Sequence, residues 1–190
     1  MAIVLASQSP RRQELLARIG VEDFKTLSLD IDESYPEGLS PEDTVRYIAK
    51  KKCDAAAALC APDDLIITAD TMVFLDNDRL GKPRDEEDAL RMLRALSGRG
   101  HTVCTGVSVR RGAQEERFAV STRVFFRPMT DDEIRAYIKT GEPMDKAGAY
   151  GVQSRGALIV ERIDGDFFNV MGLPVEQLGL VLARFGVKLL

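Results

Sequence analysis

The sequence is poor in histidine and cysteine, with one histidine and three cysteines among 190 residues. The cysteines are an odd number with no Cys-x-x-Cys spacing, which predicts reduced, mostly packed thiols in a cytoplasmic protein. They are Cys53, Cys60 and Cys104. A nucleophilic cysteine would need a partner base, and nothing in the sequence places His101 beside any of the three thiols. A cysteine–histidine enzyme is therefore disfavoured.

Long hydrophobic runs and an excess of positive charge are also lacking. No apolar stretch approaches the roughly 20 residues of a membrane-spanning helix. The apolar start MAIVLAS has neither the basic region nor the long apolar core of a signal peptide. The net charge is −4 with acids and bases interspersed, whereas proteins that bind nucleic-acid polymers usually carry a basic face. We therefore expect no membrane and no nucleic-acid polymer as a partner, while a small anion held by a few local cations is compatible with the sequence.

The phosphate-binding pattern GxxxxGK[ST] is absent, which excludes kinases and other proteins built on that loop. What is present is an alternation of helical and strand-like segments. Strands are expected at 2–6, 65–70, 101–111, 116–128, 156–163 and 166–172. The strand at 65–70 is expected to continue over 71–80, with a turn at 76–78. Helices are expected from Ser9 to Gly20, from Ser40 to 59, over 85–98, over 130–141 and after Pro174, while 24–31 is irregular or strand.

This alternation, with a hairpin around Gly112, predicts an α/β protein with a mixed sheet. The length suffices for one domain or for two small lobes, and the sequence shows no boundary between them.

Two arginines stand where cations are unfavourable. In LASQSPRRQELL, Ser9 is a good N-cap and Pro10 suits the first helical position, so Arg11 and Arg12 lie in the first turn. That is the positive end of the helix dipole. Arginines together with unpaired backbone N–H groups would bind phosphate, and the helix follows a strand, where α/β folds bind ligands. The spacing is equally compatible with both side chains extending into water.

Acidic residues occur at two places that could hold a metal. Asp70 follows the apolar run LIITA, where burying a carboxylate is costly unless it is paired or metal-bound; the alternative is a turn-forming aspartate. LDIDES contributes Asp30, Asp32 and Glu33, which could equally form a solvated acidic loop. Magnesium typically takes one or two carboxylates together with phosphate oxygens and water, so Asp70 and one acid of IDES would suffice.

Lysines and a glycine-rich segment add further candidates. The run 50–52 is typical of a solvated helix face, and at least two of its lysines are expected to be solvated. Lys82, in GKPRD, stands on a tight turn from which it could reach phosphate as a point charge. The segment 142–156, EPMDKAGAYGVQSRG, contains Gln153, whose amide could read a base edge with one donor and one acceptor. The alternative is a flexible surface connection.

Taken together, these segments resemble the Maf family of septum-formation-inhibitor-like proteins. The match covers essentially the whole chain through LASQSPRRQELL, the IDES acid, the KKKCDA lysine, ITADTMV, GKPRD, LSGRGHTVCTGV, DKAGAYGVQ and GDFFNVMGLP. The resemblance implies one domain over 1–190, either compact or with two lobes around a central cleft. It also implies an ITPase-like α/β fold, in which helices flank a strongly twisted mixed sheet. The resemblance further implies a cytoplasmic protein that uses a divalent metal, Mg2+ or Mn2+. It is compatible with a homodimer.

The resemblance also assigns roles to residues. It makes Asp70 the catalytic base and, with Glu33, a metal ligand. It makes Arg11, Thr71 and Gln153 specificity residues, and it gives phosphate-binding positions to Ser9, Arg12, Lys52 and Lys82. The motifs SPRR, ADT and YGVQ match the subgroup specific for dTTP and UTP, although Ser154 stands where a glycine is common.

The implied reaction is hydrolysis of dTTP, UTP and modified pyrimidine triphosphates to the monophosphate and pyrophosphate, by metal-assisted attack of water on the α-phosphorus. Gln153 could pair with N3–H and a neighbouring carbonyl of uracil or thymine, or it could only hold its own loop. The biological role implied is house-cleaning or cell-division arrest. The competing hypothesis is a non-enzymatic regulator of septum formation that binds nucleotide or protein, but a base, metal acids and phosphate cations together favour chemistry.

Overall fold

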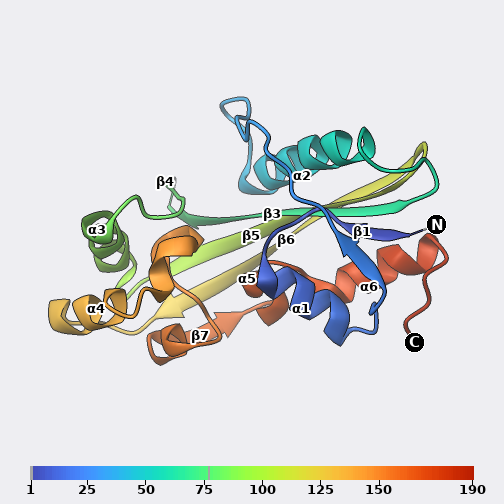
Figure 1. Cartoon of the computed structure of the whole chain (residues 1–190). Helices are drawn as coiled ribbons and strands as arrows, with labels where there is room; N and C mark the ends of the chain where they lie inside the picture. Colours follow the sequence, from blue (N-terminus) through green and yellow to red (C-terminus); the bar gives the residue numbers. More distant parts are fainter. Residues whose placement is uncertain (1, 77) are drawn as a thin grey trace. The chain divides into compact units, whose positions relative to one another are not determined.

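The computed structural model describes residues 2–76 and 78–190, and the described residues form a seven-stranded mixed sheet with helices (Figure 1). The strands are β1 (Ile3–Leu5), β2 (Phe24–Thr26), β3 (Leu65–Leu75), β4 (Asp78–Leu80), β5 (Gly100–Arg111), β6 (Gln114–Phe126) and β7 (Val160–Asp164). The α-helices are α1 (Pro10–Arg18), α2 (Pro41–Ala57), α3 (Glu86–Leu96), α4 (Asp131–Ile138), α5 (Phe167–Met171) and α6 (Val175–Arg184).

The strand order is β2-β1-β3-β5-β6-β7, with β4 paired to β3. β1 pairs in parallel with both β2 and β3, whereas β3–β4 and β6–β7 are antiparallel. The predicted mixed α/β class is confirmed. Among the described residues, no helix has both the length and the apolar character needed to cross a membrane.

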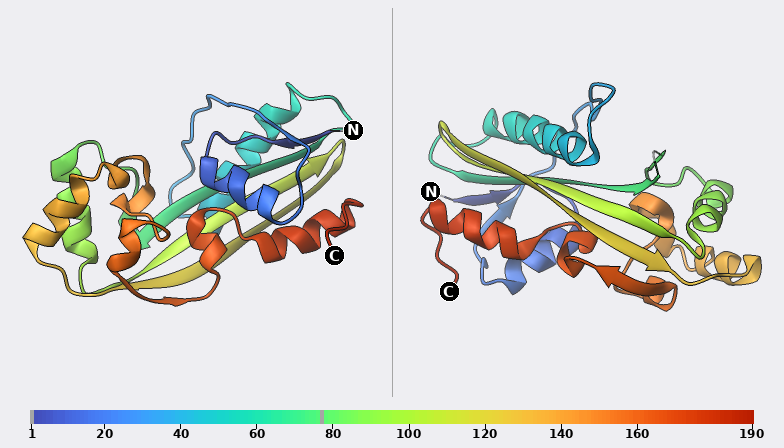
Figure 2. Two further views of the ribbon diagram at one scale, coloured as in Figure 1. Left: turned by 60° about the horizontal axis from the view of Figure 1, so that its bottom comes forward. Right: turned by 180° about the vertical axis from the view of Figure 1, so that it is seen from behind.

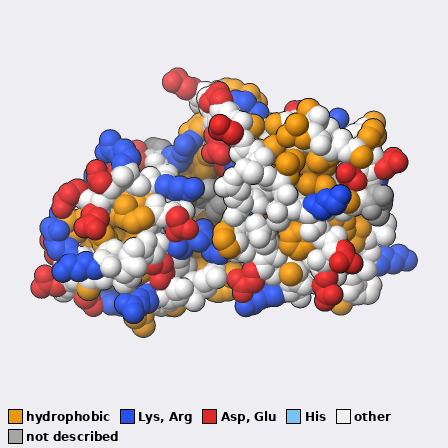
Figure 3. Space-filling view, in the orientation of Figure 1, with side chains coloured by type: hydrophobic (Ala, Val, Ile, Leu, Met, Phe, Trp, Pro, Cys, Tyr) orange, Lys and Arg blue, Asp and Glu red, His pale blue; other side chains and the backbone are white. Residues whose placement is uncertain are grey.

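The chain divides into two compact units. The first unit comprises Met1–Asp70, Thr105–Val120 and Gly172–Leu190, and the second comprises Thr71–Cys104 and Ser121–Met171. The strands β3, β5 and β6 contribute residues to both units. On the face shown in Figure 3, acidic and basic side chains are interspersed.

In the first unit, α2 covers one face of the sheet, and α1 and α6 lie on the other (Figures 1 and 2). The contact of α2 with the sheet is close because Gly106 of β5 has no side chain. A Cβ atom there would overlap the backbone carbonyl of Val45 and lie 2.6 Å from the backbone nitrogen of Arg46. Thr68 of β3 strengthens the same contact, donating its hydroxyl proton to the carbonyl of Ala49 at 2.7 Å. This packing fixes α2 against β3.

We expect Gly106→Ala to lower the free energy of unfolding by about 2 kcal/mol or more, because the overlap is with backbone and the helix must shift. Gly179, within α6, provides the matched control, since nothing lies within 4 Å of a Cβ built there. Gly179→Ala should raise the free energy of unfolding by about 0.5–1 kcal/mol, because alanine favours the helix. Urea unfolding of both variants measures the contrast, and equal changes would contradict the packing described.

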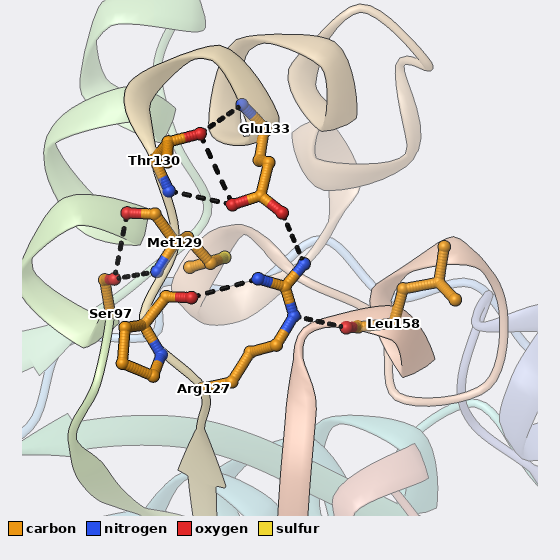
Figure 4. Close-up of polar contacts among 7 residues, drawn as sticks. Ser97, Arg127, Met129, Thr130, Glu133 and Leu158 are labelled. Atoms are coloured by element: carbon orange, nitrogen blue, oxygen red, sulfur yellow. Dashed lines mark hydrogen bonds and ion pairs between the residues drawn. The ribbon is translucent and has the colours of Figure 1, made fainter.

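In the second unit, α4 begins with a reciprocal cap that Figure 4 shows in detail. Thr130 Oγ1 accepts the backbone N–H of Glu133, whose carboxylate accepts the backbone N–H of Thr130 at 2.8 Å. Arg127 donates to the same carboxylate at 2.8 Å and to the carbonyl of Leu158 at 2.9 Å. The hydrogen bond from Arg127 is the main reason why the pKa of Glu133 falls to about 2. These contacts hold the start of α4.

Most of the predicted elements are confirmed, but the strand expected over 166–172 is wrong. The chain there forms the short helix α5. Thr122 Oγ1 binds both backbone groups of Asp166 at 3.1 Å, and the Asp166 carboxylate accepts the N–H of Phe168 at 2.7 Å. The buried amide of Asn169 donates to the carbonyl of Val103 at 3.0 Å. The contacts with Thr122 and Val103 come from other strands, so a short apolar run could not reveal them.

One further boundary differs from the sequence expectations, and two other expectations concern residues 24–31 and 76–78. The strand predicted from 156 begins at Val160, because Arg155–Leu158 forms a 3-10 turn. The ambiguous segment 24–31 contributes only the short β2. The turn predicted at 76–78 includes Asn77, which lies outside the described residues.

Candidate active site

Asp70 is a buried carboxylate within a continuing strand. Its side chain is 8% exposed, and Oδ1 accepts a hydrogen bond from Lys52 Nζ at 2.8 Å. Oδ2 is buried and has no hydrogen-bond partner among the described residues. The strand continues to Leu75, so Asp70 is not a turn residue. A buried acceptor without a donor is costly, which makes Oδ2 the atom available to a proton or a cation.

Lys52 joins the two acids predicted as metal ligands. Its Nζ lies 2.8 Å from Asp70 Oδ1 and 2.9 Å from Glu33 Oε1. The lysine side chain is 15% exposed, whereas that of Glu33 is 55% exposed. Lys52 comes from α2, so the close packing of this helix on β3 places the cation beside Asp70. Glu33 therefore remains in an exposed loop but pairs with Lys52.

The other two lysines of the run lie at the surface, as predicted. Lys50 pairs with Asp54 of the same helix. Lys51 donates to the carbonyl of Ser34 at 3.1 Å and lies 3.3 Å from Asp32. Successive residues of a helix point in different directions, which is why one lysine of the three enters the site.

Arg12 does not extend into water. Its Nε donates to the carbonyl of Gly172 at 2.8 Å, and Nη1 donates to the carbonyl of Ala69 at 2.9 Å. Burial lowers the pKa of Arg12; the charge of Asp70 opposes this effect and the charge of Arg11 adds to it. The guanidinium therefore ties the start of α1 to the residue preceding Asp70. Its predicted contact with phosphate stays a prediction.

Ser9 occupies the predicted N-cap position of α1, but its side chain makes no capping hydrogen bond. Its backbone N–H instead donates to Ser7 Oγ at 3.3 Å, and this oxygen also accepts from Arg12 Nη1 at 3.3 Å. The first unit thus brings together Arg12, Glu33, Lys52 and Asp70, with Ser9 and Arg11 at the adjoining helix start.

Three predicted residues belong to the second unit. Thr71 is its first residue, and Lys82 and Gln153 are both exposed. The turn that carries Lys82 contacts the glycine-rich segment, because Gly81 accepts the backbone N–H of Gly148 at 3.0 Å. Gly148 has φ 71°, and a Cβ there would lie 3.0 Å from a methyl group of Val73. The positive φ and the contact with Val73 of β3 therefore favour glycine at this position.

A buried aromatic cluster in the second unit was not predicted from the sequence. His101 Nε2 lies 2.8 Å from the hydroxyl of Tyr150, and its ring packs edge-on against Phe126 at 4.9 Å between centroids. Burial lowers the pKa of His101 to about 4. The contacts of His101 with Tyr150 and Phe126 join segments far apart in sequence, so the sequence around the histidine could not predict them.

We expect His101 to make the protein less stable in mild acid. The folded state keeps the imidazole neutral down to a pKa of about 4, while the unfolded chain protonates it near 6.5. The unfolded state therefore binds the extra proton, and stability falls as pH drops from about 6.5 to 4, by up to about 3 kcal/mol. Urea unfolding at pH 7.5 and 4.5 measures this loss. His101→Gln should show a smaller pH dependence, and an unchanged one would assign the acid sensitivity elsewhere.

Two other polar residues escaped the sequence analysis, namely Tyr137 and Glu142, whose side chains bind backbone N–H groups around Gln153. The only available signal was indirect: an irregular, glycine-rich segment must find partners for its backbone outside a sheet or helix.

The fold places the chain in a class of proteins with an ITPase-like architecture. The Ham1 protein of Staphylococcus aureus aligns over 97% of this chain and 100% of that chain, with a TM-score of 0.55 and 15% identity. A HAM1 protein from Coxiella burnetii aligns over 97% and 99%, with a TM-score of 0.56 and 15% identity. At this identity the likeness concerns the fold alone, and it confirms the ITPase-like fold expected from the sequence.

The sequence comparisons identify the family to which the chain belongs. A protein of Bacillus velezensis, named dTTP/UTP pyrophosphatase, is 47% identical over 186 residues, which cover 98% of this chain and 97% of that protein. A protein of Dictyoglomus turgidum with the same name is 47% identical over 191 residues, covering 99% and 98%. The family model described as Maf-like protein matches residues 2–185. The chain belongs to the Maf family.

Proposed function

We propose that this protein is a nucleoside triphosphate pyrophosphatase that hydrolyses dTTP and UTP to the monophosphate and pyrophosphate. The observation that carries the proposal is the state of Asp70, a buried carboxylate with one oxygen bound to Lys52 and the other without a partner among the described residues. The names of relatives that match almost the whole chain support the same activity.

Asp70 suits the role of general base. Lys52 fixes the orientation of the carboxylate through Oδ1, which leaves Oδ2 to accept a proton from the attacking water. Arg12 holds the backbone on the amino side of Asp70, and its charge, with that of Lys52, suits a site for phosphate. Ser9, Arg11 and Lys82 are the further phosphate-side residues of the proposal.

Glu33 and Asp70 would hold a divalent cation, Mg2+ or Mn2+. No three His, Cys, Asp or Glu side chains gather into a metal-binding group within the described residues. Magnesium needs only one or two carboxylates when phosphate and water supply the other ligands, so the donor set fits. When bound, the cation would neutralise phosphate charge and make the bound water more acidic. Titrating Mg2+ against activity in Glu33→Gln tests the ligand role, and an unchanged requirement would argue against it.

Gln153 is the proposed reader of the base. Uracil and thymine offer an acceptor, a donor and an acceptor, and the glutamine amide can pair with N3–H and a neighbouring carbonyl. Cytosine has no hydrogen on N3 and would mismatch a glutamine held in one orientation. The 5-methyl group lies away from this edge, so dTTP and UTP should be accepted alike.

The test is release of pyrophosphate from dTTP, UTP, CTP and GTP, with and without Mg2+. We expect kcat/KM for CTP to be lower than for UTP by about 100-fold or more, with GTP lowest. Gln153→Glu should remove this preference. Equal kcat/KM for UTP and GTP would overturn the pyrimidine assignment alone. Nucleotide binding without pyrophosphate release would overturn the activity and favour a non-enzymatic regulator.

We place the proposed activity in the cytoplasm, where nucleoside triphosphates are available. Cys53, Cys60 and Cys104, all within the described residues, form no disulfide, which agrees with a reducing compartment.

A further inference from the structure

We propose that Tyr137 and Glu142 are positioning residues that hold the turn carrying Gln153 in the shape needed to select the base. The turn comprises residues 151–156, and we call the two side chains the clasp. The inference rests on the proposed function, in which Gln153 contacts the base. Every contact described below for the clasp and the turn lies within the second unit.

The turn needs side-chain partners because it belongs to no strand. Around it the chain forms only short 3-10 turns, at Glu142–Asp145, Ala147–Ala149 and Arg155–Leu158. Backbone N–H groups in such a segment must be satisfied by side chains or water. Both ends of the turn, Gly151 and Gly156, are buried, whereas Gln153 at its tip is exposed. The buried ends are where the clasp acts.

Tyr137 of α4 binds the first end of the turn. Its hydroxyl accepts the backbone N–H of Gly151 at 3.0 Å and donates to Glu142 Oε1 at 2.8 Å. Burial raises the pKa of Tyr137 above its usual value. The hydroxyl therefore keeps its proton at neutral pH and remains a donor to the carboxylate.

Glu142 binds the second end of the turn. Its Oε2 accepts the backbone N–H of Arg155, and its Oε1 accepts that of Gly156, both at 3.2 Å. One hydroxyl and one carboxylate, linked by their own hydrogen bond, thus bind backbone donors on both sides of Gln153. Fixing both ends of a short turn restricts the orientation of the residue between them.

The two ends also pack too closely to shift independently. A Cβ atom at Gly156 would overlap the carbonyl oxygen of Gly151 and lie 2.7 Å from the Tyr137 hydroxyl. A Cβ at Gly151 would lie 2.8 Å from Lys146 Cε. The helix that supplies Tyr137 is itself held by the cap at Thr130 (Figure 4). The clasp is therefore built on an anchored helix and closes a narrow turn.

The test begins with Tyr137→Phe, which removes only the hydroxyl. We expect the ratio of kcat/KM for UTP to that for CTP to fall about 10-fold, while kcat for UTP changes less than about 3-fold. Backbone amides of Gly151, Arg155 and Gly156 should exchange with solvent faster. An unchanged ratio would overturn the role in base selection.

Tyr150→Phe is the matched control, because it removes another buried hydroxyl of the second unit, one bound to His101 rather than to the turn. It should leave the UTP-to-CTP ratio unchanged. An equal fall in both variants would mean that any loosening of this unit relaxes selectivity, which would overturn the specific role of the clasp. If Tyr137→Phe does not fold, Glu142→Gln takes its place and should lower the UTP-to-CTP ratio of kcat/KM by the same factor.

Combination with Gln153→Ala separates positioning from general damage. If the clasp acts through Gln153, adding Tyr137→Phe to Gln153→Ala should produce no further fall in the ratio, whereas a further fall would overturn the inference. If the parent protein releases pyrophosphate from no triphosphate, the proposed function fails and base selection falls with it. Amide exchange then still decides the structural part, because unchanged exchange in Tyr137→Phe would show that the clasp does not hold the turn.

Discussion

Replacing Asp70 by asparagine is expected to lower kcat for pyrophosphate release from dTTP by at least about 100-fold, the usual range for removing a general base. The asparagine amide has nearly the same size and can still accept from Lys52, but it cannot take a proton from water. Stopped assays over a range of dTTP concentrations separate kcat from KM. Retained activity would assign the base to another residue.

Asp88 is the matched control for this variant. It is also a buried carboxylate, but it binds Arg91 at 2.8 Å and the backbone N–H of Arg84 at 3.1 Å, near the start of α3. Hydrogen bonds from Arg91 and Arg84 lower its pKa. Asp88→Asn should reduce thermal stability and leave kcat unchanged at temperatures where the protein is folded. A comparable loss of kcat in both variants would indicate general damage rather than the loss of a base.

Replacing Lys52 by methionine should lower kcat/KM for dTTP by about 100-fold and should also destabilise the protein. Methionine keeps the length of the stem but leaves Asp70 and Glu33 without the cation that both contact. A buried carboxylate left unpaired costs about 3–5 kcal/mol when burial is complete. Steady-state kinetics and thermal unfolding measure the two effects.

Lys51→Met, on the same helix, is the control for Lys52→Met. Lys51 contacts Asp32 and Ser34, which are both exposed, so both activity and stability should change little. Lys52→Arg keeps the charge and should recover part of the activity. If Lys51→Met and Lys52→Met behave alike, the bridge between the carboxylates has no functional role.

Local physical chemistry was sufficient for most of the secondary structure. The helices at Ser40 and Thr130 begin where their side chains accept backbone N–H groups, and an N-cap followed by acidic residues is visible within one turn of sequence. The hairpin around Gly112 and the strand beginning with LIITAD follow from short-range patterns as well. Residue chemistry indicated Arg11, Arg12, Asp70 and one acid of IDES as candidates, whereas the family resemblance singled out Glu33 and Lys52.

The tertiary structure alone decided which of these groups meet. Three adjacent lysines look alike in sequence, and the packing of α2 on β5 at Gly106 and on β3 at Thr68 directs Lys52 to Asp70. The helix α5 replaced a predicted strand because Thr122, more than 40 residues earlier, binds Asp166. Arg12 donates to the backbone carbonyls of Ala69 and Gly172, and Glu142 accepts backbone N–H groups beside Gln153. Such contacts join distant parts of the chain, and their strength depends on burial, so neither composition nor periodicity contains them.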